Sequence, residues 1–532
     1  MDKHAVRSLL EHVAALLELR GEGPERVRAH QVAVERELLA SGRSDTLDEL
    51  REQVPPGLVE MLRIPGLGVA KVRQIHDRLH VESLAELEDA AGDGRLTGLP
   101  RFGRRTAEKV LRGIAALRRD STFRLLHHAL DEAQRIAAAL AAEGGVRRVE
   151  IAGSVRRRRE IIRDLDFVVV AGSGSREALV RRLGEVPGVI EFVGKEGVVT
   201  LRFASGSVVD VFLATPDDFG VTWIRATGAA QHVADIQARL EGGGGPWPDE
   251  ESVYRAAGLP WIAPELREGT GEVEAAAAGR LPRLIQQRDV RGFLHCHTNY
   301  SDGSTTVAEW ATACRDAGYD WVGITDHSES STYGGGLRAA DIARQHAEID
   351  AANRQFDGFR ILKGVEADIL ADGSLDYGPA VLDRFDFVIG SIHTRFGMSE
   401  GEMTARVLKA MDDPHMTILG HPTGRLLLSR DPYAIDLERV FERAADRGVA
   451  VELNADPHRL DLDWRMVRRA RELGVTISLG ADAHSIAGMS NVAVGLGIAR
   501  KGWLEASDVL NSRDADGFLA HARGRGGRAA YA

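Results

Sequence analysis

The strongest constraint on the fold is a regular alternation of strand and helix patterns in residues 291–532. Seven short apolar runs in this region end, in chain order, at His297, Asp326, Glu366, His393, His421, Asn454 and His484. Repeated strand–helix units build parallel sheets, and seven of them predict a closed α/β barrel. The loops at the carboxyl ends of barrel strands converge on one face, which is where such folds carry their active sites.

Six of these seven strand ends supply histidines or carboxylates of the types that bind metal ions. The candidate ligands are His295, His297, Asp302, His327, Glu366, His393, His421, Asp482 and His484. Residues two apart on a strand face the same side, so His295 and His297 are expected to converge, whereas Cys296 between them faces away and packs. A single histidine is more often structural than a ligand, but chance does not explain nine such residues at successive strand ends.

A mixed set of nitrogen and oxygen ligands suits zinc, manganese or iron, and this many ligands predict a site for two or three ions. Closely spaced ions stabilise the attacking and leaving oxygens of a phosphate ester and activate water. We therefore expect residues 291–532 to hydrolyse phosphoesters. Asp326 and Asn454 are expected to orient the ligands from behind.

The motifs around these residues resemble the polymerase and histidinol phosphatase (PHP) family. They are His295-Cys296-His297, Ser301-Asp302-Gly303, Thr325-Asp326-His327-Ser328, Gly364-Val365-Glu366, Ser391-Ile392-His393, Gly420-His421-Pro422 and Gly480-Ala481-Asp482-Ala483-His484. The resemblance implies a distorted (βα)7 barrel with a trinuclear metal centre. Each of the nine ligands of the family pattern has a counterpart in this chain.

A second constellation of acidic residues lies upstream, in a β-rich region that starts near Val149. Asp164 and Asp166 share one side of a predicted strand, and a neighbouring strand is expected to bring Asp210 beside them. Three such carboxylates bind magnesium or manganese for in-line phosphoryl transfer. Upstream of them, Gly153, Ser154 and Arg157 are expected to contact a nucleotide triphosphate.

This constellation resembles the palm of family X DNA polymerases, which implies deoxynucleotides as substrates and a carboxylate triad as the catalytic centre. The resemblance weakens beyond Gly220. Where that family has a Tyr-Phe-Thr-Gly-Ser element, this chain has Arg225-Ala226-Thr227-Gly228-Ala229, without the stacking aromatic side chains. The thumb is also predicted to be shortened, since the stretch from Gly242 to Gly245 replaces a longer segment. Metal binding by the palm is thus expected to persist better than polymerisation.

Two glycine-containing turns in the helical N-terminal region resemble helix-hairpin-helix motifs, which imply binding to the DNA backbone without sequence readout. Gly66, Gly68 and Lys71 belong to the first, and Gly103, Arg104 and Arg105 belong to the second. Glycine lets backbone N–H groups approach a phosphate, and the following helix N-terminus attracts it further. At the position of the family X lyase lysine, this chain has Gln74.

The chain is predicted to be a multidomain α/β protein. The expected domains are 1–143, helical and DNA-binding; 144–245, a nucleotidyltransferase-like palm; 246–290, a thumb remnant and linker; and 291–532, the PHP barrel. A net charge of −11 argues against a protein that coats nucleic acid with a uniformly basic surface, although arginines are concentrated between Arg95 and Arg163. With no apolar run long enough to span a bilayer, no export signal and only two cysteines, a cytoplasmic location without membrane contact is expected.

These features together predict a DNA repair enzyme that acts on gapped or damaged DNA. The barrel is expected to be a 3′–5′ exonuclease and 3′-end phosphoesterase, and the palm to be a gap-filling polymerase. Three alternatives stay open: a nuclease with a vestigial palm, a DNA-binding scaffold with structural metals, and a small-molecule phosphatase. The DNA-binding helices argue against the last, because a small substrate needs no grip on a phosphate backbone.

Overall fold

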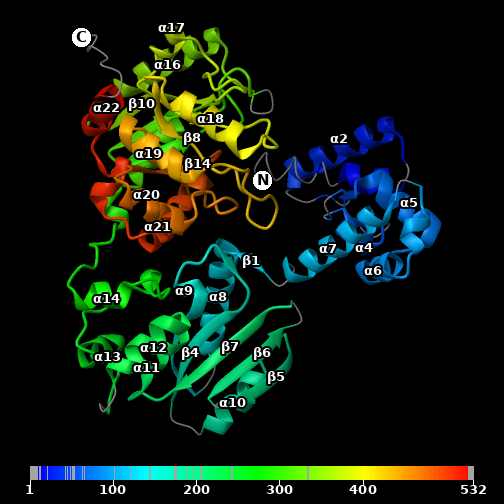
Figure 1. Cartoon of the computed structure of the whole chain (residues 1–532), viewed down its shortest axis with the longest axis vertical. Coiled ribbons are helices and arrows are strands. Elements are labelled where there is room, and N and C mark those ends of the chain that lie inside the picture. Colours follow the sequence, from blue (N-terminus) through cyan, green and yellow to red (C-terminus); the bar gives the residue numbers. More distant parts are fainter. Residues whose placement is uncertain are drawn as a thin grey trace. The chain divides into compact units, whose positions relative to one another are not determined.

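The computed structural model divides the chain into two compact units, residues 1–122 and 123–532. It describes residues 10, 13–20, 22–41, 44, 46–47, 50, 54–62, 64, 66–100, 102–120, 123–142, 145–172, 176–186, 188–195, 197–203, 206–240, 244–331 and 335–524. Figure 1 shows both units.

The first unit is helical in its described residues, as predicted. Its helices are α2 (Pro24–Ser41), α4 (Pro56–Met61), α5 (Val69–Leu79), α6 (Leu84–Gly92), the 3-10 helix η1 (Arg95–Gly98) and α7 (Arg104–Asp120). Apolar residues at helical spacing, such as Val72 and Ile75 on α5 and Val110 and Ile114 on α7, pack into one core. That core fixes the turns that precede α5 and α7.

The second unit begins with a five-stranded mixed sheet in the order β2-β4-β7-β6-β5 (Figure 1). Its strands are β2 (Val146–Ile151), β4 (Leu165–Ala171), β5 (Val189–Lys195), β6 (Val198–Phe203) and β7 (Val208–Ala214). A short ribbon pairs β1 (Arg124–Leu125) with β3 (Ile161–Ile162), and α9 (Gly153–Arg156) and α10 (Arg176–Gly184) complete the palm.

Helix α8 (Leu126–Ala142) packs on this sheet, although the helical domain was predicted to extend to residue 143. Its residues Leu126, Ala129, Ala133 and Leu140 share a core with the strands. A helix buries its apolar stripe against whichever surface complements it, and periodicity alone does not identify that surface. The boundary between the two units consequently falls at Thr122 and Phe123.

The described residues between 219 and 284 form a helical subdomain, where palm, thumb remnant and linker are expected in succession. Its helices are α11 (Phe219–Thr227), α12 (Ala230–Arg239), α13 (Glu250–Ala256), η2 (Pro264–Leu266) and α14 (Glu272–Ala277). They share one apolar core that includes Ile224, Ile236 and Tyr254, so the boundary predicted at residue 245 lies inside a packed region.

The predicted seven-stranded parallel barrel is confirmed, with the cyclic order β10-β11-β12-β13-β14-β8-β9. The strands are β8 (Gly292–Cys296), β9 (Trp321–Ile324), β10 (Arg360–Asp368), β11 (Phe387–Ser391), β12 (Met416–Leu419), β13 (Ala450–Asn454) and β14 (Ile477–Ala483). The helices are α15 (Val307–Asp316), α16 (Ala339–Asn353), α17 (Pro379–Leu382), α18 (Glu400–Met411), α19 (Leu437–Arg447), α20 (Trp464–Glu472), α21 (Asn491–Lys501) and α22 (Ala515–Gly524).

The amino-terminal end of the barrel is closed by α22. Phe518 on this helix lies 4.6 Å from the Trp321 ring and 5.0 Å from the Phe387 ring, measured between centroids. Trp321 and Phe387 are the first residues of β9 and β11, so this apolar plug fills the end where the strands begin. The opposite end, where the candidate ligands lie, is left for a polar site.

Among the described residues, no helix is both long and apolar enough to cross a bilayer. Cys296 and Cys314 are buried and free, and Cys296 belongs to the barrel core, as its predicted packing role requires.

Candidate metal centre and acidic cluster of the sheet

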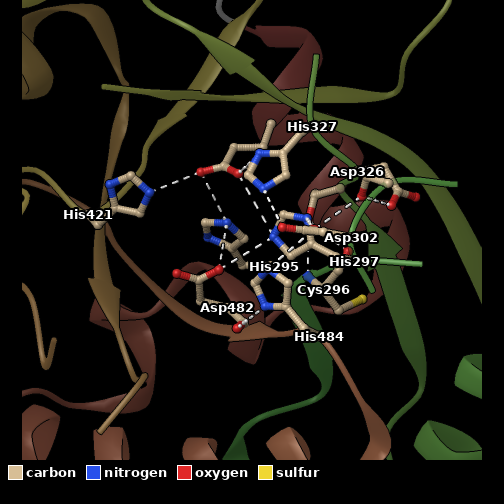
Figure 2. Close-up of polar contacts among 12 residues, drawn as sticks. His295, Cys296, His297, Asp302, Asp326, His327, His421, Asp482 and His484 are labelled. Atoms are coloured by element: carbon tan, nitrogen blue, oxygen red, sulfur yellow. Dashed lines mark hydrogen bonds and ion pairs between the residues drawn. The ribbon is translucent and has the colours of Figure 1, made fainter. Parts of the chain in front are cut away.

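All nine predicted ligands of the barrel gather at the carboxyl ends of its strands (Figure 2). His295 is on β8, Glu366 on β10 and Asp482 on β14, while the other six follow directly or closely after strands. Figure 2 shows the rings of His295, His297, His327 and His484 around a shared space, and the Cys296 sulfur outside it.

Glu366 lies at the centre of the cluster, and its carboxylate faces five histidine rings. The closest pairs are His327 Nδ1 to Oε2 at 2.8 Å, His421 Nε2 to Oε1 at 3.0 Å, His295 Nε2 to Oε1 at 3.3 Å, His393 Nε2 to Oε1 at 3.4 Å and His297 Nε2 to Oε2 at 3.8 Å. One carboxylate can thus be shared by ions bound on different sides of it.

Asp302 and Asp482 hold the two flanks of the cluster. Asp302 lies 3.3 Å from His484 Nε2 and 3.5 Å from His327 Nε2. Asp482 Oδ1 lies 3.4 Å from His297 Nε2 and 3.6 Å from His295 Nε2. Both carboxylates therefore sit between pairs of imidazoles.

The side chains form three overlapping groups whose ligand atoms lie within 4.8 Å of one another. The groups are His297, Asp302, His327 and His484; His295, His297 and Asp482; and His327, Glu366 and His393. His297 and His327 each belong to two groups, so three ions could share ligands. His421 joins the cluster through Glu366.

Unsatisfied polar atoms at the centre of the cluster fit a metal site. His297 is fully buried, yet neither ring nitrogen has a hydrogen-bond partner among the described residues. His295 Nε2, His327 Nδ1 and Glu366 Oε2 also make no hydrogen bond among the described residues, although each lies within 3.3 Å of an oppositely charged group. Buried polar atoms without partners are costly, and a bound cation would satisfy these. The donor set of imidazole and carboxylate suits divalent transition metals.

Two of these groups, His297 and Glu366, are already in the protonation state that binds a cation. Burial lowers the pKa of His297 to about 3, with help from the nearby His484 and His327 rings, so this imidazole is neutral near pH 7. Burial alone would raise the pKa of Glu366, but His393, His295 and His327 outweigh it and hold that pKa well below its usual range. A neutral imidazole and an ionised carboxylate are the forms that bind metals. Burial favours the neutral rings of His295 and His327, but nearby carboxylates outweigh it and raise the pKa of both well above the usual range, so a bound cation would displace protons from them.

Three side chains of the cluster are partly exposed to solvent. The side chains of His393, His484 and Asp302 are 22%, 34% and 36% exposed, whereas His295 and His297 are completely buried. A substrate can therefore meet His393, His484 and Asp302.

Two ligand positions have an unusual backbone. His295 has a backbone φ of 59° and Asp482 has a backbone φ of 50°, values that residues other than glycine rarely adopt. The ladder between β14 and β8 shifts register between Gly480 and Ala483, beside both residues. These bulges re-aim side chains at the site, so regular alternation along β8 and β14 does not describe their ends.

Sequence reasoning missed three side chains that contact the candidate ligands. Glu452 lies 2.5 Å from His295 Nδ1, Asp368 lies 2.6 Å from His393 Nδ1, and Arg459 Nε lies 3.4 Å from Asp482 Oδ2. A signal was present for Asp368, which stands two residues after Glu366 on the same strand. For Glu452, the only hint was a charged residue inside an otherwise apolar run.

Of the two residues expected to orient ligands, Asn454 contacts one through its side chain, whereas Asp326 contacts one only through its backbone carbonyl, which accepts the Glu366 N–H at 3.1 Å. Asn454 Nδ2 donates to Asp482 Oδ2 at 3.1 Å. Asp326 accepts hydrogen bonds from the Thr298 backbone at 2.7 Å, from the Thr298 hydroxyl at 2.6 Å and from Gln345 at 2.6 Å. It thereby orders the loop that leads to Asp302.

In the palm, the structure brings the three predicted carboxylates together. Asp166 on β4 and Asp210 on β7 are direct partners in a parallel ladder, and Asp164 immediately precedes β4. Burial first, then the charges of Asp164 and Asp210, raise the pKa of Asp166 to about 7. The Thr200 hydroxyl donates to Asp210 at 2.5 Å. Such mutual repulsion would be relieved by a divalent cation.

The three predicted nucleotide contacts differ in their surroundings. Gly153 has φ of 60°, and a Cβ there would lie 1.7 Å from Asp166 Oδ2, so only glycine fits beside that carboxylate. The Ser154 hydroxyl is buried without a partner among the described residues, which suits a ligand contact. Arg157 is already engaged by Glu268 at 2.9 Å and by the Thr227 carbonyl.

Both predicted hairpins lead into helices. Gly66 has φ of 89°, Gly68 is the N-cap of α5, and the Lys71 ammonium donates to the Gly66 carbonyl at 2.7 Å. Gly103 directly precedes α7, and Arg104 and Arg105 are exposed on its first turn. Gln74, at the lyase-lysine position, donates to the Pro100 carbonyl at 3.3 Å and so links the two hairpins.

Comparisons with known proteins cover both units. A PHP domain model matches residues 294–456, and a model of the SAM-like helix-hairpin-helix tandem matches residues 58–116. The DNA polymerase/3′-5′ exonuclease PolX of Bacillus subtilis is 34% identical over 98% of this chain and 99% of its own length. A probable phosphatase of Caldanaerobacter subterraneus is 31% identical over 30% of this chain and 60% of its own length.

Proposed function

Because this chain belongs to the PolX family of bacterial DNA polymerase/3′-5′ exonucleases, we propose that its barrel removes nucleotides and blocking groups from DNA 3′ ends during repair. The observation that carries this proposal is the cluster of nine ligand-type side chains with partnerless buried atoms at its centre. A scaffold with structural metals would have no need for the solvent-exposed edge formed by His393, His484 and Asp302.

The nine proposed ligands would hold two or three zinc, manganese or iron ions. When bound, these ions supply positive charge to the phosphoryl oxygens and activate water. The protein itself contributes a largely buried cluster of polar side chains, of which His393, His484 and Asp302 are partly exposed and can meet a substrate. The guanidinium of Arg459 lies beside Asp482, where it can contact the phosphate of a terminal nucleotide.

The test is degradation of a 5′-labelled, gapped DNA duplex by the metal-free and metal-loaded protein. We expect a ladder of products shortened from the 3′ end with zinc, manganese or iron, and none after chelation. Release of the label as a mononucleotide, without a ladder of shortened strands, would contradict the proposed polarity. A metal-loaded protein inert on this duplex and on 3′-phosphorylated DNA would favour the scaffold instead.

The second proposed activity is gap filling by the palm, with magnesium or manganese held by Asp164, Asp166 and Asp210. The pairing of Asp166 with Asp210 and the partnerless Ser154 hydroxyl favour it. The engagement of Arg157 by Glu268 favours the vestigial alternative, because this guanidinium must leave its partner to reach a nucleotide. Primer extension distinguishes the two readings.

The helical unit is proposed to grip the DNA backbone through its two hairpins. The Arg104 side chain is 93% exposed, and it lies with Arg105 at the N-terminus of α7, where helix dipole and side-chain charge both attract phosphate. A DNA substrate suits the proposed cytoplasmic location. The two buried cysteines, which form no disulfide, also suit a reducing compartment.

Replacing both Arg104 and Arg105 by alanine is expected to weaken binding to any DNA sequence. The slope of log affinity against log salt concentration is negative, and each lost phosphate contact should bring it closer to zero by about 0.9. Fluorescence anisotropy with duplex DNA at several salt concentrations measures this slope. Arg78→Ala is the control, because it removes an exposed arginine from the last turn of α5, at the end of that helix away from its hairpin. Equal slopes for the double variant and wild type would exclude these hairpin contacts.

A further inference from the structure

Glu452 is a fully buried carboxylate on β13 that is not one of the nine proposed ligands, yet it contacts two of them. Its Oε1 lies 2.5 Å from His295 Nδ1, and its Oε2 accepts the backbone N–H of His421 at 2.7 Å. Each oxygen of the Glu452 carboxylate thus contacts a residue that is itself a proposed metal ligand.

The contact with His295 determines which ring nitrogen is free. A neutral imidazole carries one proton, and a carboxylate at hydrogen-bond distance holds that proton on the nitrogen it faces. In the neutral form of the ring, which is the form that binds a metal, the proton therefore resides on Nδ1 and the lone pair is on Nε2. That atom lies 3.3 Å from Glu366 and 3.6 Å from Asp482, and it has no hydrogen-bond partner among the described residues.

Asn454 extends the influence of Glu452 to a third proposed ligand. Its Nδ2 donates to Glu452 Oε2 at 3.2 Å and to Asp482 Oδ2 at 3.1 Å. The Glu452 carboxylate is therefore connected with His295, with the backbone of His421 and, through Asn454, with Asp482. These three ligands come from different strands or strand ends.

The neighbouring strand is shaped to admit this carboxylate. Gly480 on β14 is the ladder partner of Asn454, and a Cβ at Gly480 would lie 1.9 Å from Glu452 Oε1. The same Cβ would lie 3.1 Å from the Cβ of His295. Only glycine leaves room for the Glu452–His295 contact.

We propose that Glu452 is a positioning residue that fixes the tautomer and orientation of His295, and so sets the metal affinity of the group formed by His295, His297 and Asp482. This inference rests on the proposed metal centre, but it makes a statement about binding rather than about cleavage.

The test compares the full-length variants Glu452→Gln and Gly480→Ala with wild type. Metal affinity is measured by competition with a chelator, and ligand geometry by the visible absorption of the Co²⁺-loaded protein. Glutamine offers only one oxygen where two are used, so Glu452→Gln should weaken binding of one ion by about 10- to 100-fold and change the Co²⁺ spectrum. Gly480→Ala should do the same by displacing an intact carboxylate.

Glu272→Gln is a matched control in the same chain. Glu272 is also fully buried and also faces a histidine Nδ1, that of His232 at 2.8 Å, but it lies outside the barrel cluster. This variant should lose stability without any change in metal affinity or spectrum. Thermal unfolding of all three variants checks that they are folded.

Wild-type affinity and an unaltered spectrum in folded Glu452→Gln would overturn the positioning role. Failure of the nuclease proposal is distinguishable, because it would leave wild-type protein binding metal with no DNA degradation. In that case, a changed spectrum in the two variants still supports Glu452. Wild-type protein that binds no metal would overturn the proposed centre and the role of Glu452 together.

Discussion

Replacing His297 by alanine is expected to abolish 3′–5′ degradation of DNA while leaving primer extension by the palm unchanged. His297 belongs to two of the three ligand groups, is completely buried, and has no hydrogen-bond partner on either ring nitrogen within the described part of the chain. Changing groups that only support metal ligands already costs about 10- to 100-fold. We expect loss of a shared ligand to lower the exonuclease rate by at least about 100-fold.

The rate is measured with 5′-labelled duplex at saturating metal, and metal content is measured on the same sample. His346→Ala is the matched control, because it also removes a buried imidazole from the barrel, one that packs on Phe385 instead of joining the cluster. That variant should lose stability but keep its exonuclease. Wild-type degradation by His297→Ala would exclude this residue from the active centre.

Replacing Asp210 by alanine is expected to have the opposite effect, removing primer extension and leaving the exonuclease intact. Asp210 is the ladder partner of Asp166 and accepts a hydrogen bond from Thr200, so it is held in place to share an ion with Asp166. Positioning and charge stabilisation carry most of phosphoryl-transfer catalysis. We expect extension to fall by at least about 100-fold, as for other losses at a two-ion site.

Extension of a primer across a short gap, with magnesium and with manganese, measures this effect. Asp217→Ala removes an exposed carboxylate just after the same strand and should extend normally. Equal extension by Asp210→Ala and wild type would exclude the palm triad as the catalytic centre. No extension by wild type under any condition would establish that the palm is vestigial.

The positions of the candidate ligands were predictable because a parallel barrel imposes them. Strand and helix periodicity is local, and the convergence of carboxyl strand ends follows from the fold. The same reasoning applies to Asp166 and Asp210, which alternation along two neighbouring strands brings together. In both clusters, residue type and strand position were enough to predict which side chains lie close together.

Packing partners were less predictable than strand ends. Helix α8 and the helices of residues 219–284 have clear apolar faces, but those faces do not identify the surface that covers them. Arg157 likewise stands at a position expected to contact nucleotide, and the structure pairs it with Glu268, which is 111 residues away.

The sequence by itself determined a seven-stranded barrel with candidate metal ligands at one end, since short-range periodicity encodes the strands and residue type marks their ends. Only the tertiary structure decided how those ligands are oriented. The left-handed backbone at His295 and Asp482 depends on a register shift between strands β8 and β14. The carboxylate of Glu452 reaches His295 across 157 residues of chain, a contact that depends on strand pairing and on the absence of a side chain at Gly480.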